Sequence, residues 1–501
     1  MMALYYKIFC ILGIIFSTNN EVETKDVQKT SEVVVIGGGM AGMAAARRLL
    51  QEGTMYVKVF EAKSNRYGGR VWTNWTAVKD IRGADLELGA SMLNTRAKKN
   101  PLLDLVKEFQ IETRNAGSIQ VYFPGREKTI LSGDNATNLY TEAFKIAIGA
   151  LNSVKSSGQD IPVNDMLAAA LEEAYGSESP PKYDRDMIQS IFDSLPTVNL
   201  EDFSALQYEI ENDFGWDQIV VDGVGALLDR IVAGPTGRDI AVKVELKKVL
   251  RHIKIDHDKK KVLIRTTDRK QTVADAVIIA LPIGVLKSGT IIFEPPLEEE
   301  KYKAIQRLGV GYSCKVIVGF EEAFWPKDVG TFTVFSDTAS NGFLQTWSNS
   351  YRITGNPFLT GNILGEKALM WEKKSEDEQK ADVLEVLSEM FGEETVAAHE
   401  ITTFLVSDWS SDNFTQGSVS YPVVGSTPEL WKTLQEPACP YIFFAGAYTE
   451  SSGHVDSLHG AYNSGIRAAE QLISHVCRSK SKATRKAKKS GTQKASKKDE
   501  L

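Results

Sequence analysis

The hydrophobic residues of this chain follow two different spacings, and these spacings predict its elements. Continuous apolar runs, typical of strands that are buried on both faces, occupy 33–36 and 276–280. Apolar residues recur at helical spacing in 139–151 and 163–174, and a further helix is expected at 375–391. The mixture of buried strands and amphipathic helices indicates an α/β fold.

The first apolar strand leads directly into a glycine-rich turn. Gly37, Gly39 and Gly42 fit the pattern G-x-G-x-x-G, and a helix is expected to begin at Met40 and to run to residue 50. In this pattern the glycines permit a tight turn, a close approach of the backbone to a pyrophosphate, and close packing of helix against strand. The free N–H groups and the positive dipole end of the helix then face the phosphates.

An acidic residue extends this pattern. A second strand at 57–59 is followed by Glu61, which is placed to accept hydrogen bonds from the hydroxyl groups of an adenosine ribose. The glycine pattern alone is a weak signal, but the strand, the helix and the acid together predict dinucleotide binding. The alternative is a glycine turn that serves only packing.

Further motifs decide which dinucleotide is bound. An NAD enzyme needs no second glycine pair with an arginine, yet 66–70 reads RYGGR and 86–90 reads LELGA. Related segments follow at 280–287, 444–446 and 459–465. Together these segments resemble the flavin-containing amine oxidase family over roughly residues 32–473, and within it they are most similar to the polyamine oxidases.

The resemblance implies a two-domain organisation. A Rossmann-like FAD-binding domain would be assembled from three separated segments, 31–97, 211–290 and 401–476, and the intervening segments 98–210 and 291–400 would form an α+β substrate domain. FAD would be bound non-covalently, because Ser418 replaces the cysteine that carries covalent flavin in monoamine oxidases.

The resemblance also implies a reaction. A hydride equivalent passes from the carbon next to an amine nitrogen to flavin N5, the imine hydrolyses, and O2 is reduced to H2O2. The implied partners are therefore a small amine, expected to be a polyamine or an acetylated polyamine, and O2.

Individual roles follow by position in the motifs. Lys315, on an apolar strand, matches the lysine that holds a water near flavin N5, and burial should lower its pKa; the alternative is an edge lysine that reaches solvent. The positions expected to bind FAD are Gly37, Gly39, Gly42, Glu61, Arg70, Val249, Trp409 and Gly446. The positions expected in the substrate pocket are Asn94, Val419 and Ser457.

Several positions depart from the family pattern and leave alternatives open. Ala447 replaces a glutamate, Val419 and Ser457 replace an aromatic pair, and Asn94 stands where plant-type enzymes have a glutamate. These departures keep open an oxidase of another amine or of an amino acid. They also keep open a flavin-binding protein with weak or lost activity, and Trp409 could be a simple core residue.

The two ends of the sequence suggest a location. Residues 1–20 contain a short apolar stretch after Lys7 that is typical of a signal peptide, and 498–501 reads KDEL, an endoplasmic-reticulum retention signal. The expected location is the lumen of that compartment, with a KDEL-type receptor as partner, and secretion is the alternative. Three sequons, at Asn74, Asn135 and Asn413, would then be open to glycosylation.

Charge is unevenly distributed along the chain. The formal net charge is −7, yet 478–498 contains ten Lys and Arg and no acidic residue. Such a tail is expected to be disordered. It invites a nucleic-acid role, but the signal-like segment and the retention signal oppose one. Sparse cysteines and scattered histidines predict neither a disulfide framework nor a metal site, and no segment is long enough to span a membrane.

Overall fold

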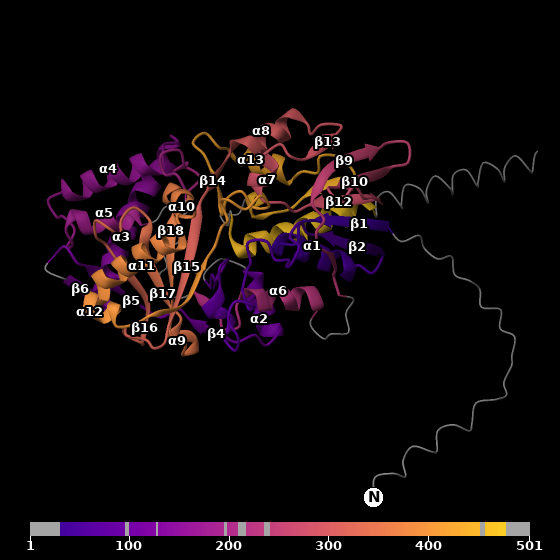
Figure 1. The fold of residues 1–501 in the computed structure, drawn as a ribbon. Helices are drawn as coiled ribbons and strands as arrows, with labels where there is room; N and C mark the ends of the chain where they lie inside the picture. The colour runs from indigo at the N-terminus through magenta and orange to yellow at the C-terminus, as the bar shows by residue number, and fades with distance from the viewer. Residues whose placement is uncertain are drawn as a thin grey trace, which may run out of the picture.

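The computed structural model describes residues 31–95, 100–126, 129–194, 198–208, 217–234, 241–450 and 456–476. The expected signal peptide at 1–20 and the expected tail at 478–501 lie outside these residues. Two lobes lie side by side, and each is built around its own sheet (Figure 1).

The first lobe contains a five-stranded parallel sheet in the order β21-β12-β1-β2-β8. Its strands come from three distant parts of the chain: β1 (Ser31–Ile36), β2 (Met55–Phe60), β8 (Lys243–Glu245), β12 (Ala276–Ile279) and β21 (Ile442–Phe444). Strand β1 is buried on both faces, as its continuous apolar run predicts.

Alternate residues of β1 enter two different cores. Val33 and Val35 pack against α1 (Met40–Gln51), α6 (Val224–Ala233) and the helical residues 458–476. Val34 and Ile36 pack against a four-stranded sheet on the opposite face. The strands of that sheet are β9 (Leu250–Asp256), β10 (Lys261–Thr266), β11 (Gln271–Ala274) and β13 (Ile292–Glu294).

The second lobe contains a seven-stranded sheet in the order β19-β15-β18-β17-β16-β5-β6. Its strands are β5 (Ser118–Phe123), β6 (Thr129–Ser132), β15 (Ser313–Phe320), β16 (Val329–Val334), β17 (Phe343–Asn349), β18 (Phe358–Leu364) and β19 (Ile401–Val406). The segment 401–476 therefore contributes β19 to this sheet and β21 to the sheet of the other lobe.

Helices cover the second lobe. They are α3 (Asp134–Ser157), α4 (Val163–Tyr175), α5 (Arg185–Asp193), α9 (Tyr351–Thr354), α10 (Glu366–Trp371), α11 (Glu376–Phe391) and α12 (Glu393–Ala397). On β15, Cys314, Val316 and Val318 point into the core under α11. Because side chains alternate between the two faces of a strand, Lys315 and Ile317 point toward the first lobe. Ile317 packs there with Leu86 and Leu88.

The remaining labelled elements lie outside these three sheets. They are η1 (Gly83–Leu86), β3 (Met92–Leu93), α2 (Pro101–Glu108), β4 (Thr113–Asn115), β7 (Gln218–Val220), α7 (Ile283–Lys287), α8 (Glu299–Arg307), β14 (Leu308–Gly311), β20 (Val419–Pro422), α13 (Pro428–Gln435) and η2 (Ala447–Thr449). Strand β7 lies between β3 and β4, and β14 pairs with β20. The α/β fold class expected from the sequence is confirmed by this architecture.

Among the described residues, no helix combines the length and apolar character that crossing a membrane requires. Within the same residues, no group of His, Cys, Asp and Glu side chains could hold a metal ion. Cys314 and Cys439 are free thiols there, and burial raises the pKa of the Cys314 thiol.

Candidate active site

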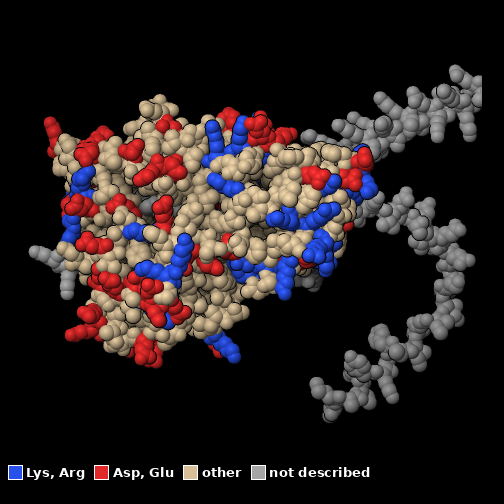
Figure 2. Space-filling view, turned by 45° about the horizontal axis from the view of Figure 1, so that its top comes forward, with Lys and Arg blue, Asp and Glu red and all other residues tan. Residues whose placement is uncertain are grey.

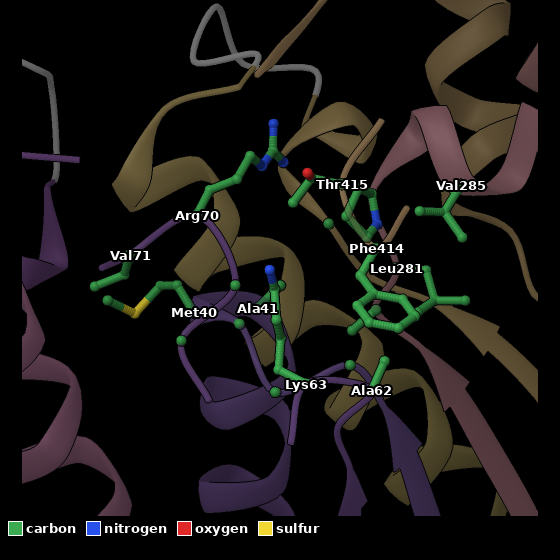
Figure 3. A pocket seen from close by; sticks show the side chains of 18 of the residues that line it. Met40, Ala41, Ala62, Lys63, Arg70, Val71, Leu281, Val285, Phe414 and Thr415 are labelled. Atoms are coloured by element: carbon green, nitrogen blue, oxygen red, sulfur yellow. The ribbon is translucent and has the colours of Figure 1, made fainter. Parts of the chain in front are cut away.

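A cavity of about 560 Å³ extends from the glycine turn after β1 to Lys315 on β15. This volume lies within the usual range for small-molecule and cofactor sites. Figure 3 shows it from close by, with Met40 and Ala41 below Arg70, and with Phe414, Leu281 and Val285 on the opposite side. The cavity contacts all three sequence segments that build the first lobe.

The glycine turn forms the first end of the cavity from backbone. Gly37 has a φ of +107°, which favours glycine, and a Cβ at Gly42 would lie 1.9 Å from the carbonyl oxygen of Gly37. Gly39 is the N-cap of α1 and provides no side chain to cap it, so the helix N-terminus is left to a ligand. Gly68 N donates to Gly38 O at 2.8 Å, which joins the second glycine motif to the first.

Glu61 lies beside this turn, directly after β2. Its side chain is 6% exposed, and its carboxylate accepts hydrogen bonds from Gly38 N at 2.9 Å and from Lys63 N at 2.8 Å. Burial raises the pKa of Glu61. Val249 lines the same cavity, and its carbonyl oxygen accepts a hydrogen bond from Thr267 N. Gly37, Gly39, Glu61 and Val249 thus line one cavity, as expected of an adenosine and pyrophosphate site.

Arg70 also lines the cavity, and Figure 3 shows its side chain extended toward Thr415. Its guanidinium donates to Asp456 Oδ1 at 2.9 Å and to the carbonyl oxygen of Ser418 at 2.7 Å. Gly446, which also lines the cavity, has a φ of +139° and donates its N–H to Ser464 Oγ at 2.9 Å.

Lys315 and Trp409 line the other end. Lys315 Nζ donates to Gly89 O at 2.6 Å and to Ser91 Oγ at 3.0 Å, and burial lowers the pKa of Lys315 to about 8. Trp409 is buried and donates its indole N–H to Leu88 O at 3.2 Å. Trp409 is therefore both a core residue and a wall of the cavity.

Two of the three expected substrate-pocket residues, Val419 and Ser457, line the same cavity, and Ser457 Oγ accepts a hydrogen bond from Gly460 N at 3.0 Å. Asn94 is not among the residues that line it; its carbonyl oxygen accepts a hydrogen bond from Asn100 Nδ2 at 2.7 Å. The role of Asn94 stays a prediction.

Sequence reasoning did not find two acidic residues of the site. Asp456 holds Arg70, but it falls between two motifs and no pattern in the chain marks it. Glu87 is 4% exposed and lies within electrostatic reach of Lys315. Its position inside the LELGA segment was a signal that could have indicated it.

The three sequons differ in accessibility. Asn135, at the start of α3, is exposed, and Asn74 is half-buried with its side-chain oxygen accepting from Thr76 Oγ1 at 3.0 Å. Asn413 is exposed at the rim of the cavity. The hydroxyl group of Thr415, which belongs to the same sequon, is buried and donates to Trp409 O at 2.7 Å.

Comparisons with known proteins agree with this geometry. The family model of flavin-containing amine oxidoreductases matches residues 40–473. Polyamine oxidase 2 of Arabidopsis thaliana is 32% identical, over 92% of this chain and 91% of that protein. Polyamine oxidase 3 of Oryza sativa subsp. japonica is 28% identical, over 91% of this chain and 93% of that protein. The fold is also that of wild-type putrescine oxidase bound to putrescine, with a TM-score of 0.69 and 22% identity over 89% of this chain and 99% of that structure.

The chain therefore belongs to the flavin-containing amine oxidoreductase family, and it is an FAD-dependent amine oxidase. The residues present fit the cofactor. The turn at Gly37 and Gly39 leaves backbone N–H groups and a helix N-terminus for a pyrophosphate, Glu61 supplies an acceptor for ribose hydroxyls, and Lys315 lies at the far end of the same cavity.

Proposed function

We propose that this enzyme oxidises polyamines or acetylated polyamines with non-covalently bound FAD. The observation that carries the proposal is Lys315, a half-buried lysine that lines the same cavity of about 560 Å³ as the glycine turn. The similarity to polyamine oxidases along most of the chain supports this substrate class.

The protein binds, orients and shields the reacting groups. The chemistry that bound FAD would supply is acceptance of a hydride from the carbon next to the amine nitrogen, with reoxidation by O2. Lys315 Nζ is fixed by Gly89 O and Ser91 Oγ, so its position at this end is held before any substrate arrives. With a pKa near 8, Lys315 is able to hold or release a proton close to neutral pH.

Two observations favour a cationic amine over an amino acid. An amino-acid oxidase needs an arginine for the substrate carboxylate, but Arg70 is already paired with Asp456. On the face in Figure 2, acidic side chains spread over the lobe that contains α3–α5 and α11, which would raise the local concentration of a polycation.

Ser418 supports the non-covalent mode of binding. Its hydroxyl group is buried and donates to Gly311 O at 3.1 Å, so the side chain is engaged in the protein. Denaturation of the purified enzyme should therefore release FAD into the supernatant, and flavin that stays with the precipitated chain would contradict this part of the proposal.

Anaerobic titration with spermine, followed by the visible flavin spectrum, tests the substrate. The expected result is bleaching of the oxidised flavin band, with N1-acetylspermine and putrescine compared in parallel. A normal flavin band that no polyamine bleaches would overturn the polyamine assignment and leave the amine oxidase class in place.

We further propose that the chain resides in the endoplasmic reticulum as a glycoprotein, retained through its KDEL sequence. The sequence features at 1–20 and 498–501, together with the exposed Asn135 and the half-buried Asn74, support this location. Expression in cultured cells, with glycosidase treatment and with Leu501 deleted, tests it. Sensitivity to endoglycosidase H and release of the deleted form into the medium are expected; a cytosolic, unglycosylated chain would contradict the proposal.

A further inference from the structure

A second, smaller cavity lies on another side of Lys315. It measures about 140 Å³, which is large enough for several water molecules, and polar residues of the seven-stranded sheet, such as Thr360 and Asn362, contribute to its wall. Lys315 lines both this cavity and the large one. Among the residues that line the small cavity, which we call the rear chamber, Lys315 and Glu87 are the two ionisable ones.

Glu87 presents an unpaired oxygen in this buried region. Its Oε2 accepts hydrogen bonds from Val224 N at 2.7 Å and from Thr73 Oγ1 at 3.0 Å. Its Oε1 is buried and has no hydrogen-bond partner among the described residues. A buried carboxylate oxygen without a partner is costly, so either water or a proton must satisfy it.

Lys315, in turn, has one N–H donor for which the described residues give no acceptor. An ammonium group has three donors, and the described residues give it two acceptors, Gly89 O and Ser91 Oγ. Neither oxygen of Glu87 bonds directly to Lys315, yet each charge acts on the other across the gap. One side thus offers a donor and the other an acceptor, and both residues line the rear chamber.

We propose that water in the rear chamber connects Lys315 to Glu87 and that the two groups exchange a proton through it. This proposal rests on the amine oxidase activity. A substrate ammonium loses one N–H proton to the neutral amine of Lys315, which becomes an ammonium; Lys315 then gives one proton through water to the carboxylate of Glu87, which becomes a carboxylic acid. No electrons move in these two transfers, and the substrate is left as the neutral amine that can release a hydride.

The titration properties of the two groups suit this exchange. Burial raises the pKa of Glu87 to about 7 and lowers the pKa of Lys315 to about 8, so the proton is held with similar strength at both positions. The N-terminus of α6, where Val224 N donates to Glu87, adds a positive dipole end.

Other charged groups near this segment face elsewhere. Asp85, two residues before Glu87, accepts hydrogen bonds from Thr354 Oγ1 at 2.6 Å and from Asn356 Nδ2 at 2.8 Å, and it does not line the rear chamber. Arg82 pairs with surface carboxylates. Asp85 is therefore a suitable control: a buried carboxylate on the same segment that is outside the proposed exchange.

Glu87→Gln separates the proposal from a purely structural role. A glutamine keeps an oxygen for Val224 N and Thr73 Oγ1 but cannot take up a proton. In anaerobic stopped-flow measurements with spermine from pH 6 to 10, flavin reduction in Glu87→Gln should be about 10- to 100-fold slower at pH 7, less than the 10²–10⁴ of a direct acid–base group. It should approach the wild-type rate above pH 9, with unchanged FAD content. Asp85→Asn should keep the wild-type profile.

Infrared spectroscopy of the resting holoenzyme provides a readout without substrate. A protonated-carboxyl band that titrates near pH 7 should be absent in Glu87→Gln and present in Asp85→Asn. In Lys315→Met its midpoint should move to higher pH, because the nearby positive charge is removed. This last measurement keeps Glu87 in place and remains decisive if Glu87→Gln does not fold.

Two results would overturn the proposal. One is a wild-type pH profile of flavin reduction in Glu87→Gln. The other is a carboxyl band whose midpoint is unaffected by Lys315→Met. A failure of spermine to reduce the flavin would instead contradict the proposed substrate and leave the resting-state titration as the test of the exchange.

Discussion

The two ends of the large cavity are built by different means. At the pyrophosphate end, the turn at Gly37–Gly42 and the single acid Glu61 come from one short stretch of chain, and backbone forms the surface. At the amine end, Lys315 and Trp409 come from two different segments of the chain, and side chains form the surface. The first end depends on local conformation, whereas the second depends on how two lobes pack against each other.

This difference separates cofactor binding from chemistry. A change in the glycine turn should prevent FAD binding without changing the surroundings of Lys315. A change at Lys315 should leave FAD bound and slow its reduction. Substitutions matched for burial or residue type test whether the two ends are independent.

The largest effect is expected for Lys315→Met. Loss of the ammonium group should slow flavin reduction by about 10²–10⁴-fold, while the flavin spectrum still shows bound FAD. Lys301→Met is a matched control, because burial also lowers the pKa of Lys301 to about 8, but its ammonium is bonded to carbonyl oxygens at the end of α13. That control should lose stability and keep its reduction rate; equal rates in both variants would refute the assignment of Lys315.

Gly42→Ala should be the next most damaging change. A Cβ there would lie 1.9 Å from Gly37 O, so the turn must shift, at a cost of about 1–3 kcal/mol or more. We expect purified protein with little or no FAD, measured as the ratio of flavin to protein absorbance. Gly149→Ala, at an open position of α3, should keep full FAD and gain about 1 kcal/mol in unfolding free energy. Full FAD occupancy in Gly42→Ala would contradict the backbone-built site.

Glu61→Gln should weaken FAD binding by about 10- to 100-fold, since a hydrogen bond to a charged group contributes roughly 1.5–3 kcal/mol. Calorimetric titration of the apoprotein with FAD measures this change. Ser457→Ala, at a position expected in the substrate pocket, should leave the FAD affinity within twofold of wild type. If the two variants changed FAD affinity equally, the two ends would not be separable.

The smallest effect on either end is expected for Asp85→Asn, at the contact between the lobes. Burial raises the pKa of Asp85 to about 6, so between its ordinary pKa and 6 the folded state binds the extra proton. The unfolding free energy of the wild type should therefore fall relative to the variant as pH rises from 4 to 7, by on the order of 2 kcal/mol. Urea unfolding across this range measures it; parallel curves for the two proteins would show that Asp85 does not titrate in this way.

The sequence predicted the locally determined features well. The glycine turn, Glu61 and the strand that contains Lys315 follow from residue spacing, because each depends on neighbours only a few positions away. Long-range pairing was less visible. Nothing in the 401–406 segment indicates that β19 pairs with β15 rather than joining the first lobe. Likewise, Asp456 and Arg70 are 386 positions apart, and no spacing of residues in the sequence indicates their contact.

The buried hydroxyl group of Thr415 has a consequence for the proposed N-glycosylation. An N-glycosylating enzyme must reach both Asn413 and the hydroxyl group two residues later, yet in the folded chain that group donates to Trp409 O. A glycan at Asn413 could therefore be added only while this segment is still unfolded. The fraction of molecules glycosylated at Asn413, compared with the fraction at exposed Asn135, would therefore report how quickly the segment 409–415 folds after synthesis.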